Sequence, residues 1–176
     1  MTQELEHALT GLICRADMTL VSSVDPEGFP ITKAMLPPRE REGVRVFWFS
    51  TNTSSQKVQA FRQNPKASLY FVDRAAFCGA SFTGTMEVLE DPAAKERLWQ
   101  QGDTLFYPKG VTDPDYCVLR FTAIRGRYLL RLDSDTFYIY HVAAVMVDNL
   151  RRLLLGINLS DKAVMDFDFP GVGFPV

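Results

Sequence analysis

The chain has 176 residues, of which 47% are hydrophobic, and this is enough to bury one core, so we expect one domain. The formal net charge of -2 gives no overall basic field, which argues against nucleic acid or an anionic membrane as a partner. No apolar run approaches the roughly 20 residues of a membrane span. The first residues include Glu4, Glu6 and His7 rather than a basic segment followed by an apolar one. We therefore expect neither membrane insertion nor export.

The cysteines Cys14, Cys78 and Cys117 are odd in number and show no CxxC spacing. This pattern is typical of buried, reduced thiols rather than of a disulfide framework or a zinc site. We expect a cytoplasmic protein.

Residues 3–16 are predicted to form a helix, because their leucines and isoleucine recur on one helical face. Strands are predicted over 18–24 and 29–36. The turn Asp25-Pro26-Glu27-Gly28 between them has proline and glycine in favourable positions, so the two strands should form a hairpin.

Two prolines and a run of charges separate this hairpin from the next strand. Pro37-Pro38 cannot continue a central strand, and Arg39 to Glu42 are predicted to form a solvated loop. A strand over 44–49 follows.

Between Phe47 and Asn64 a strand-like pattern changes into a helical one, and small polar residues stand at the change. Ser54 or Ser55 can cap the helix over 55–63, so its first amide N–H groups would point at the other polar residues of the junction. These residues are Thr51, Asn52 and Thr53.

Lys57 lies in the first turn of that helix, where a cation opposes the helix dipole by roughly a few tenths of a kcal/mol unless an anion is bound there. Hydroxyls, free amides and a lysine together indicate a phosphate site. The alternative is an ordinary capped helix with a solvated lysine, and the spacing alone does not decide between them.

Further strands are predicted over 67–71, 78–89 and 136–140, and a helix from Asp91-Pro92 to near Gly102. Residues 116–132 are predicted to form either a strand pair or one long bent strand. Gly79 and Gly84 allow the long strand over 78–89 to bend, as a closing sheet requires. The fold class is therefore mainly β: a six- to seven-stranded antiparallel split β-barrel with short flanking helices.

A helix is predicted over 142–155, and the tail 167–176 is too apolar to be free in water but too rich in proline and glycine to be a strand. We expect a barrel domain over 1–141. Residues 142–176 should pack on that barrel or on a partner subunit.

Five motifs in order carry a family resemblance: GFPITKAML, FSTNTSSQKVQAFRQNPKASLYF, FTGTMEVLED, a helix ending in LW, and YPKGVTDPDY. With them, about residues 5–140 resemble the pyridoxamine 5'-phosphate oxidase-like flavoproteins with the FMN-binding split barrel, most closely the general stress protein 26-like branch. The resemblance implies FMN as the cofactor.

The resemblance also implies which residues hold the cofactor. Lys33 would reach the FMN phosphate from the second strand and Lys57 from the helix, and Gln56 falls where some members have a phosphate-binding arginine. Two cations with hydroxyl donors suit a dianionic phosphate. The other implied contacts are Ala34, Met35 and Leu36 beside the isoalloxazine and the pair Ser50 and Thr51. Ser54 and Ser55 are added to the cofactor site by their place at the start of the helix, not by the resemblance.

In this family the flavin lies between two protomers, which implies a homodimer of twofold symmetry. Cys78, Gly79 and Trp99 would lie near that cleft, although Trp99 also fits as an anchor of its helix in the core. Gly79 stands where the oxidases place a glutamine on the flavin ring, so that hydrogen bond must come from elsewhere or be absent. Leu129 stands where they have a tryptophan, and RLD at 131–133 is a broken form of their substrate-holding motif, so classical pyridoxamine oxidation is not expected.

The sequence contains no nucleophile elbow, no GxxxxGK[ST] loop and no HExxH, and His7 and His141 are predicted to be surface or interface residues. The main hypothesis is an FMN-dependent oxidoreductase of a small molecule or electron acceptor. The alternative is a module that binds flavin, or even haem, for storage or sensing without turnover. A colourless structural dimer is a third possibility.

Overall fold

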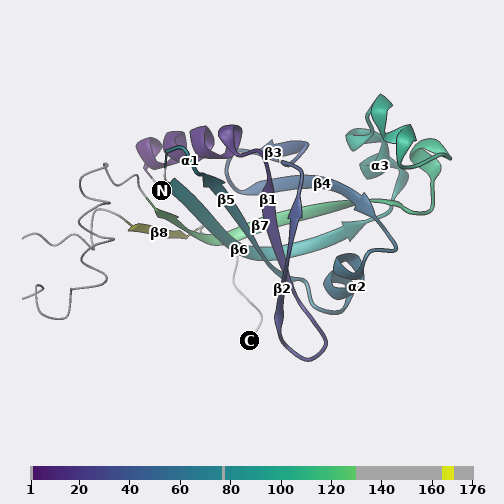
Figure 1. The fold of residues 1–176 in the computed structure, drawn as a ribbon, viewed down its shortest axis with the longest axis horizontal. Coiled ribbons are helices and arrows are strands. Elements are labelled where there is room, and N and C mark those ends of the chain that lie inside the picture. Colours follow the sequence, from purple (N-terminus) through teal and green to yellow (C-terminus); the bar gives the residue numbers. More distant parts are fainter. Residues whose placement is uncertain (1, 77, 130–163, 169–176) are drawn as a thin grey trace, which may run out of the picture.

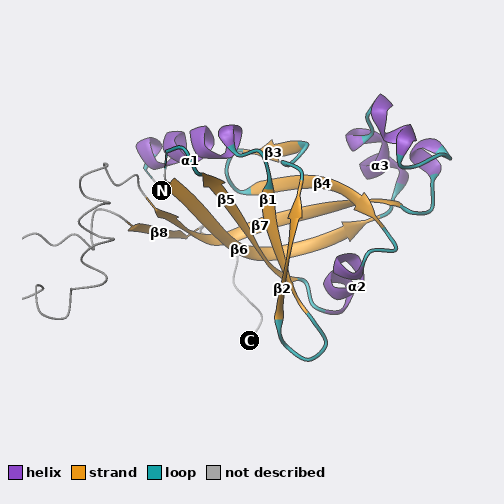
Figure 2. Ribbon diagram, in the orientation of Figure 1, coloured by secondary structure: helices purple, strands orange, loops and turns teal. Residues whose placement is uncertain are grey.

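The computed structural model describes residues 2–76, 78–129 and 164–168, which form a curved antiparallel sheet with helices around it (Figure 1 and Figure 2). The helices are α1 (Gln3–Arg15), α2 (Gln56–Gln63) and α3 (Pro92–Leu98), with the 3₁₀ helices η1 (Gln101–Leu105) and η2 (Gly110–Thr112). The strands are β1 (Thr19–Val24), β2 (Pro30–Met35), β3 (Glu40–Glu42), β4 (Val46–Asn52), β5 (Lys66–Asp73), β6 (Cys78–Leu89), β7 (Tyr116–Leu129) and β8 (Val164–Asp168).

The strands of the described part follow the order β2-β1-β5-β6-β7-β4-β3. β8 also pairs with β7, beyond the stretch of β7 that pairs with β4. Each of these pairings is antiparallel. The predicted mainly β architecture with peripheral helices is confirmed, and 116–129 forms one long strand. The predicted strand over 136–140 and helix over 142–155 lie outside the described residues.

The inner face of the curved sheet holds the main core. The ring centroid of Phe47 lies 5.3 Å from that of Phe71 and 5.4 Å from that of Phe82, and all three rings are buried. α1 adds its predicted apolar face, and α2 adds Val58 and Phe61. The core therefore fixes where α2 begins, because its buried residues hold the helix across one end of the sheet.

β2 is the exposed edge strand of this sheet. Five of its six residues are exposed, and within the described residues it pairs only with β1. The hairpin turn before it forms as predicted: Asp25 accepts a hydrogen bond from the Phe29 N–H at 2.7 Å, and Gly28 has a φ of 91°. The residues of β2 are thus open to contact on both faces.

The prediction that Arg39 to Glu42 form a solvated loop is wrong, because Glu40–Glu42 form β3 and pair with β4. Glu40 lies opposite Trp48, Trp48 opposite Arg120, and Arg120 opposite Glu87, so one row crosses four strands. Arg97 of α3 covers the Trp48 ring at 4.3 Å from its centroid and binds Glu40 at 2.6 Å. These cross-strand partners explain why a charged segment is a strand.

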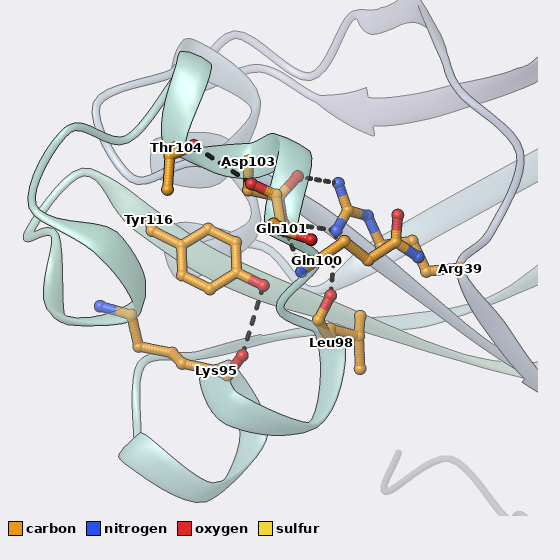
Figure 3. A network of polar contacts seen from close by, with 8 residues as sticks. All are labelled: Arg39, Lys95, Leu98, Gln100, Gln101, Asp103, Thr104 and Tyr116. Atoms are coloured by element: carbon orange, nitrogen blue, oxygen red, sulfur yellow. Dashed lines mark hydrogen bonds and ion pairs between the residues drawn. The ribbon is translucent and has the colours of Figure 1, made fainter.

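A second cluster packs α3 on the outer face of β4 and β7. Its buried residues are Trp48, Ala94, Leu98, Tyr107, Tyr116 and Val118. Beside it, Arg39 binds both carboxylate oxygens of Asp103 at 2.6 Å and donates to the Leu98 carbonyl at 2.9 Å (Figure 3). Burial opposes ionisation of Asp103, but hydrogen bonds from Arg39 and from the Gln100 N–H hold its pKa below the ordinary value. This paired, hydrogen-bonded cation anchors the η1 segment to the start of β3.

Two further boundaries differ from prediction. α3 ends at Leu98, with Trp99 as its C-cap, and η1 occupies the segment where the helix was expected to end. The expectation that the tail from Phe167 is not a strand is wrong for Phe167 and Asp168, which end β8 beside β7. The proline and glycine residues behind that expectation begin only at Pro170. Among the described residues, no helix has the length and apolar character needed to cross a membrane.

Gly84 lies at the irregularity in the β6–β7 pairing, where a Cβ would overlap the backbone carbonyl of Thr122. Gly84→Ala should therefore lower the free energy of unfolding by about 3 kcal/mol or more, because backbone would have to move. Gly79→Ala is the matched control: its closest clash is with the end of the Tyr70 side chain, which can move. Urea unfolding should show a much larger loss at position 84, and equal losses would contradict this account.

Candidate functional site

The candidate site lies where β4 ends and α2 begins. β4 ends at Asn52, and Ser55 is the N-cap residue of α2, with extended φ and ψ of -69° and 144°. Ser55 takes the predicted capping position, but its side chain makes no capping hydrogen bond. Helix geometry leaves the backbone N–H groups of Gln56 and Lys57 without acceptors inside the helix.

The hydroxyls of Thr53 and Ser55 are the unusual groups of this junction. Both oxygens are buried, and neither has a hydrogen-bond partner within the described residues. The Cys117 thiol, which lies nearby, donates instead to the Thr51 carbonyl at 3.6 Å. A buried hydroxyl without a partner costs on the order of 1–3 kcal/mol, so both groups are suited to hydrogen-bond a ligand.

Lys33 and Lys57 lie close enough to influence each other. Burial lowers the pKa of Lys57, the nearby Cys117 opposes this, and the charge of Lys33 lowers the pKa further. Lys33 pairs in register with the buried Val21, so its side chain leaves β2 on the inner face of the sheet. The structure thus brings together two lysines that are 24 positions apart in the sequence. Their mutual repulsion would be relieved by an anion between them.

Asp115 holds the turn between β4 and α2. Its carboxylate accepts from the Asn52 side-chain amide at 2.8 Å and from the Ser54 N–H at 2.7 Å, and its carbonyl accepts from the Thr53 N–H at 2.8 Å. The hydrogen bonds from Asn52 and Ser54 lower the pKa of Asp115 below its usual value. In the sequence, Asp115 is marked only by its place in the DPD of the YPKGVTDPDY motif.

The other residues expected at the cofactor lie on β4 and β2, and on each strand they point to both faces of the sheet. Thr51 is buried on the inner face with Phe49, so Ser50, its neighbour in the strand, points to the opposite face. On β2, Ala34 and Leu36 are exposed and Met35 packs partly against the core. Their backbone lies along the free edge of the sheet, where a planar ring could contact it.

Cys78, Gly79 and Trp99, which were also expected near the cofactor, lie apart from the lysine pair in this chain. Cys78 and Gly79 begin β6 opposite the end of β5, whereas α2 precedes the start of β5. The ring of Tyr70 covers Gly79, and its hydroxyl occupies the place of a side chain there. The Tyr70 hydroxyl is therefore the group that could donate a hydrogen bond at position 79, where the oxidases place a glutamine.

Trp99 packs in the second cluster, with ring centroids 6.2 Å from Tyr107 and 5.2 Å from Tyr116. Burial raises the pKa of both tyrosines to about 12. Trp99 therefore anchors the end of α3, as its alternative interpretation expected.

No cluster of metal-binding side chains occurs among residues 2–76, 78–129 and 164–168. Asp113, which lies beside Asp115 in the sequence, accepts hydrogen bonds from the Lys109 and Asp115 N–H groups. Turn formation thus accounts for Asp113.

Residues 5–130 match the model of the pyridoxamine 5'-phosphate oxidase family. None of the curated proteins compared with the chain matches it.

Solved structures share the fold. A Clostridium acetobutylicum protein related to general stress protein 26 of B. subtilis (pyridoxinephosphate oxidase family) is 38% identical, with a TM-score of 0.66 over 73% of this chain and 89% of that chain. The general stress protein 26 of Bacillus anthracis is 19% identical, with a TM-score of 0.61 over 74% and 100%. A pyridoxamine 5'-phosphate oxidase-related, FMN binding protein from Nostoc punctiforme is 15% identical, with a TM-score of 0.57 over 73% and 83%. The last two show the fold alone, and together the matches confirm the predicted split barrel.

The lowered pKa of Lys57 predicts how the stability of the ligand-free protein depends on pH. The folded state releases this proton at lower pH than the unfolded chain does, so the lysine adds stability as the pH rises toward its ordinary pKa of 10.5. Lys57→Met lacks this dependence. The free energy of unfolding of the wild type should rise relative to that of Lys57→Met as the pH increases toward 10.5. Parallel pH profiles from denaturant titrations would contradict the burial of this amine.

Proposed function

Because the chain belongs to the pyridoxamine 5'-phosphate oxidase family, we propose that it is an FMN-binding flavoprotein and an oxidoreductase of a small organic molecule or electron acceptor. The observation that carries this proposal is the pair Lys33 and Lys57 beside two buried hydroxyls without partners. The FMN binding description of the Nostoc punctiforme neighbour supports flavin as the cofactor class.

The groups at the start of α2 fit a phosphate dianion. Two ammonium groups match its charge, the hydroxyls of Thr53 and Ser55 can donate to its oxygens, and the free N–H groups of the first helical turn add further donors. Bound phosphate would also remove two local costs, which are the repulsion between the lysines and the unsatisfied hydroxyls. A solvated lysine on an ordinary capped helix has neither feature.

The flavin ring would extend from that phosphate along the edge of β2, beside the backbone of Ala34 to Leu36. When bound, the flavin supplies hydride or electron transfer. The chain's own contribution is to bind the phosphate, orient the ring and exclude water. Lys33 and Lys57 would anchor the phosphate through charge-assisted contacts.

Turnover distinguishes the oxidoreductase from a flavin- or haem-binding module. The purified protein should be yellow, and its visible band should bleach with a reductant under anaerobic conditions and recover with an acceptor. A bound pigment without accelerated reoxidation across many acceptors would favour storage or sensing. Cys14, Cys78 and Cys117 form no disulfide with one another, which supports action in the reducing cytoplasm, although Cys14 is exposed rather than buried as expected.

We propose a homodimer with the flavin between the subunits. β2 exposes both faces, and large apolar side chains gather around it: Phe29 is 67% exposed, Ile31 39% and Leu36 79%. Apolar side chains on an exposed edge strand are typical of an interaction surface. A second copy of the chain would cover them and enclose the flavin ring.

Lys57→Ala should weaken FMN binding by about 10- to 150-fold, because a charge-assisted contact to the phosphate contributes on the order of 1.5–3 kcal/mol. Riboflavin, which lacks the phosphate, should bind the wild type and the variant equally. Quenching of flavin fluorescence at fixed salt measures both dissociation constants. Lys66→Ala, which removes an exposed lysine of β5, is the matched control, and an unchanged constant in Lys57→Ala would refute this phosphate site.

Ile31→Glu should convert the dimer to monomers, since two symmetry-related charges would be buried without partners at the interface. Sedimentation velocity measures the change in mass, and FMN affinity should fall with it. Gln3→Glu adds the same charge at the exposed start of α1 and should leave the dimer intact. A wild type that is monomeric with FMN bound would disprove the shared cleft.

A further inference from the structure

We propose that Asp115 is the positioning residue of the phosphate site: it holds the turn between β4 and α2 so that the hydroxyls of Thr53 and Ser55 stay available to the ligand. This inference rests on the proposed FMN function and concerns a residue that does not itself touch the cofactor.

Asp115 controls the turn through contacts that are far apart in sequence. Its Oδ2 accepts from Asn52 Nδ2 at 2.8 Å, its Oδ1 accepts from the Ser54 N–H at 2.7 Å, and its carbonyl accepts from the Thr53 N–H at 2.8 Å. One residue of the segment before β7 thus binds three consecutive residues of the turn. Such multiple bonding fixes the backbone of the turn before any ligand arrives.

Other backbone groups of the turn also bond within the protein. The Ser55 N–H donates to the Asn52 carbonyl at 3.1 Å, and Gln59 Nε2 donates to the Thr53 carbonyl at 3.2 Å. The two hydroxyls that have no partner are therefore the groups left over by this arrangement. A turn whose backbone is held in this way presents them without further ordering, which favours binding.

The charge of Asp115 argues for positioning and against a direct role. A carboxylate near a phosphate repels it, so on charge alone this residue would weaken FMN binding. Both carboxylate oxygens instead accept hydrogen bonds from the turn, and these bonds lower the pKa of Asp115. The benefit of an ordered turn must exceed the repulsion.

Asp115 is itself held by hydrogen bonds that lead to α3. Asp113 accepts from the Asp115 N–H at 2.9 Å, and the buried Lys95 of α3 donates to the Asp113 carbonyl at 2.8 Å. A continuous set of hydrogen bonds therefore joins α3 to the turn at the start of α2.

The test compares FMN with riboflavin in Asp115→Ala. Positioning predicts that the dissociation constant for FMN rises at least about tenfold while that for riboflavin stays unchanged. Charge alone predicts tighter FMN binding. Asp115→Asn can keep both hydrogen bonds if the Asn52 amide reverses, so it should restore most of the affinity.

Glu90→Gln is the charge control, because Glu90 pairs with Arg62 of α2 and makes no contact with the turn that the structure records. It should bind FMN as the wild type does or slightly more tightly. Asn52→Ala removes one of the Asp115 bonds and should weaken FMN binding less than Asp115→Ala. Circular dichroism and thermal unfolding establish whether each variant is folded. If Asp115→Ala does not fold, FMN binding by Asn52→Ala decides the question.

Three outcomes would overturn the inference: unchanged or tighter FMN binding in Asp115→Ala, equal weakening for FMN and riboflavin, or an Asp115→Asn variant as weak as Asp115→Ala. In the absence of a folded Asp115→Ala, unchanged binding in Asn52→Ala has the same meaning. A wild type that does not prefer FMN to riboflavin would instead refute the proposed phosphate site.

Discussion

The pairing of β6 with β7 is the constraint on which the other elements depend. β7 pairs with β6 along almost its whole length, and its other edge is shared between β4 and β8. The close approach of Gly84 to the Thr122 carbonyl lets these long strands bend. That bend curves the sheet around the phenylalanine core, and the core then places α2 across one end, where the candidate site forms.

The site shows a local departure from the rules that stabilise the rest of the chain. Elsewhere, charges such as Arg39 and Asp103 are paired and turns such as that at Asp25 are satisfied, although the Thr19 hydroxyl and the Trp48 indole N–H also lack partners within the described residues. At the start of α2 two hydroxyls without partners lie together, and the half-buried amine of Lys57 lies near a second lysine. Local conflict inside a well-satisfied fold is expected where a ligand completes the structure.

Local signals in the sequence were enough to predict much of the fold. Alternation, capping residues and turn residues predicted the hairpin, α2 and the long strands. The family resemblance predicted that Lys33 and Lys57 act on one ligand, and the structure shows that the two lysines lie near each other. β3 was missed because its charges are stabilised by Trp48 and Arg97, which no local pattern connects to it. The role of Asp115 depends on a contact 63 positions distant, and the free hydroxyl of Ser55 contradicts the capping bond that its residue type favours.

Lys33 has a consequence that concerns the solution behaviour of the protein rather than its ligand. It lies on an edge strand whose outer hydrogen-bonding groups would otherwise be a template for unwanted strand addition, and a charge on the inner face of such an edge discourages that pairing. Replacing Lys33 would therefore promote aggregation, in addition to removing one charge of the proposed phosphate site. Solubility must be followed alongside any measurement that uses this residue.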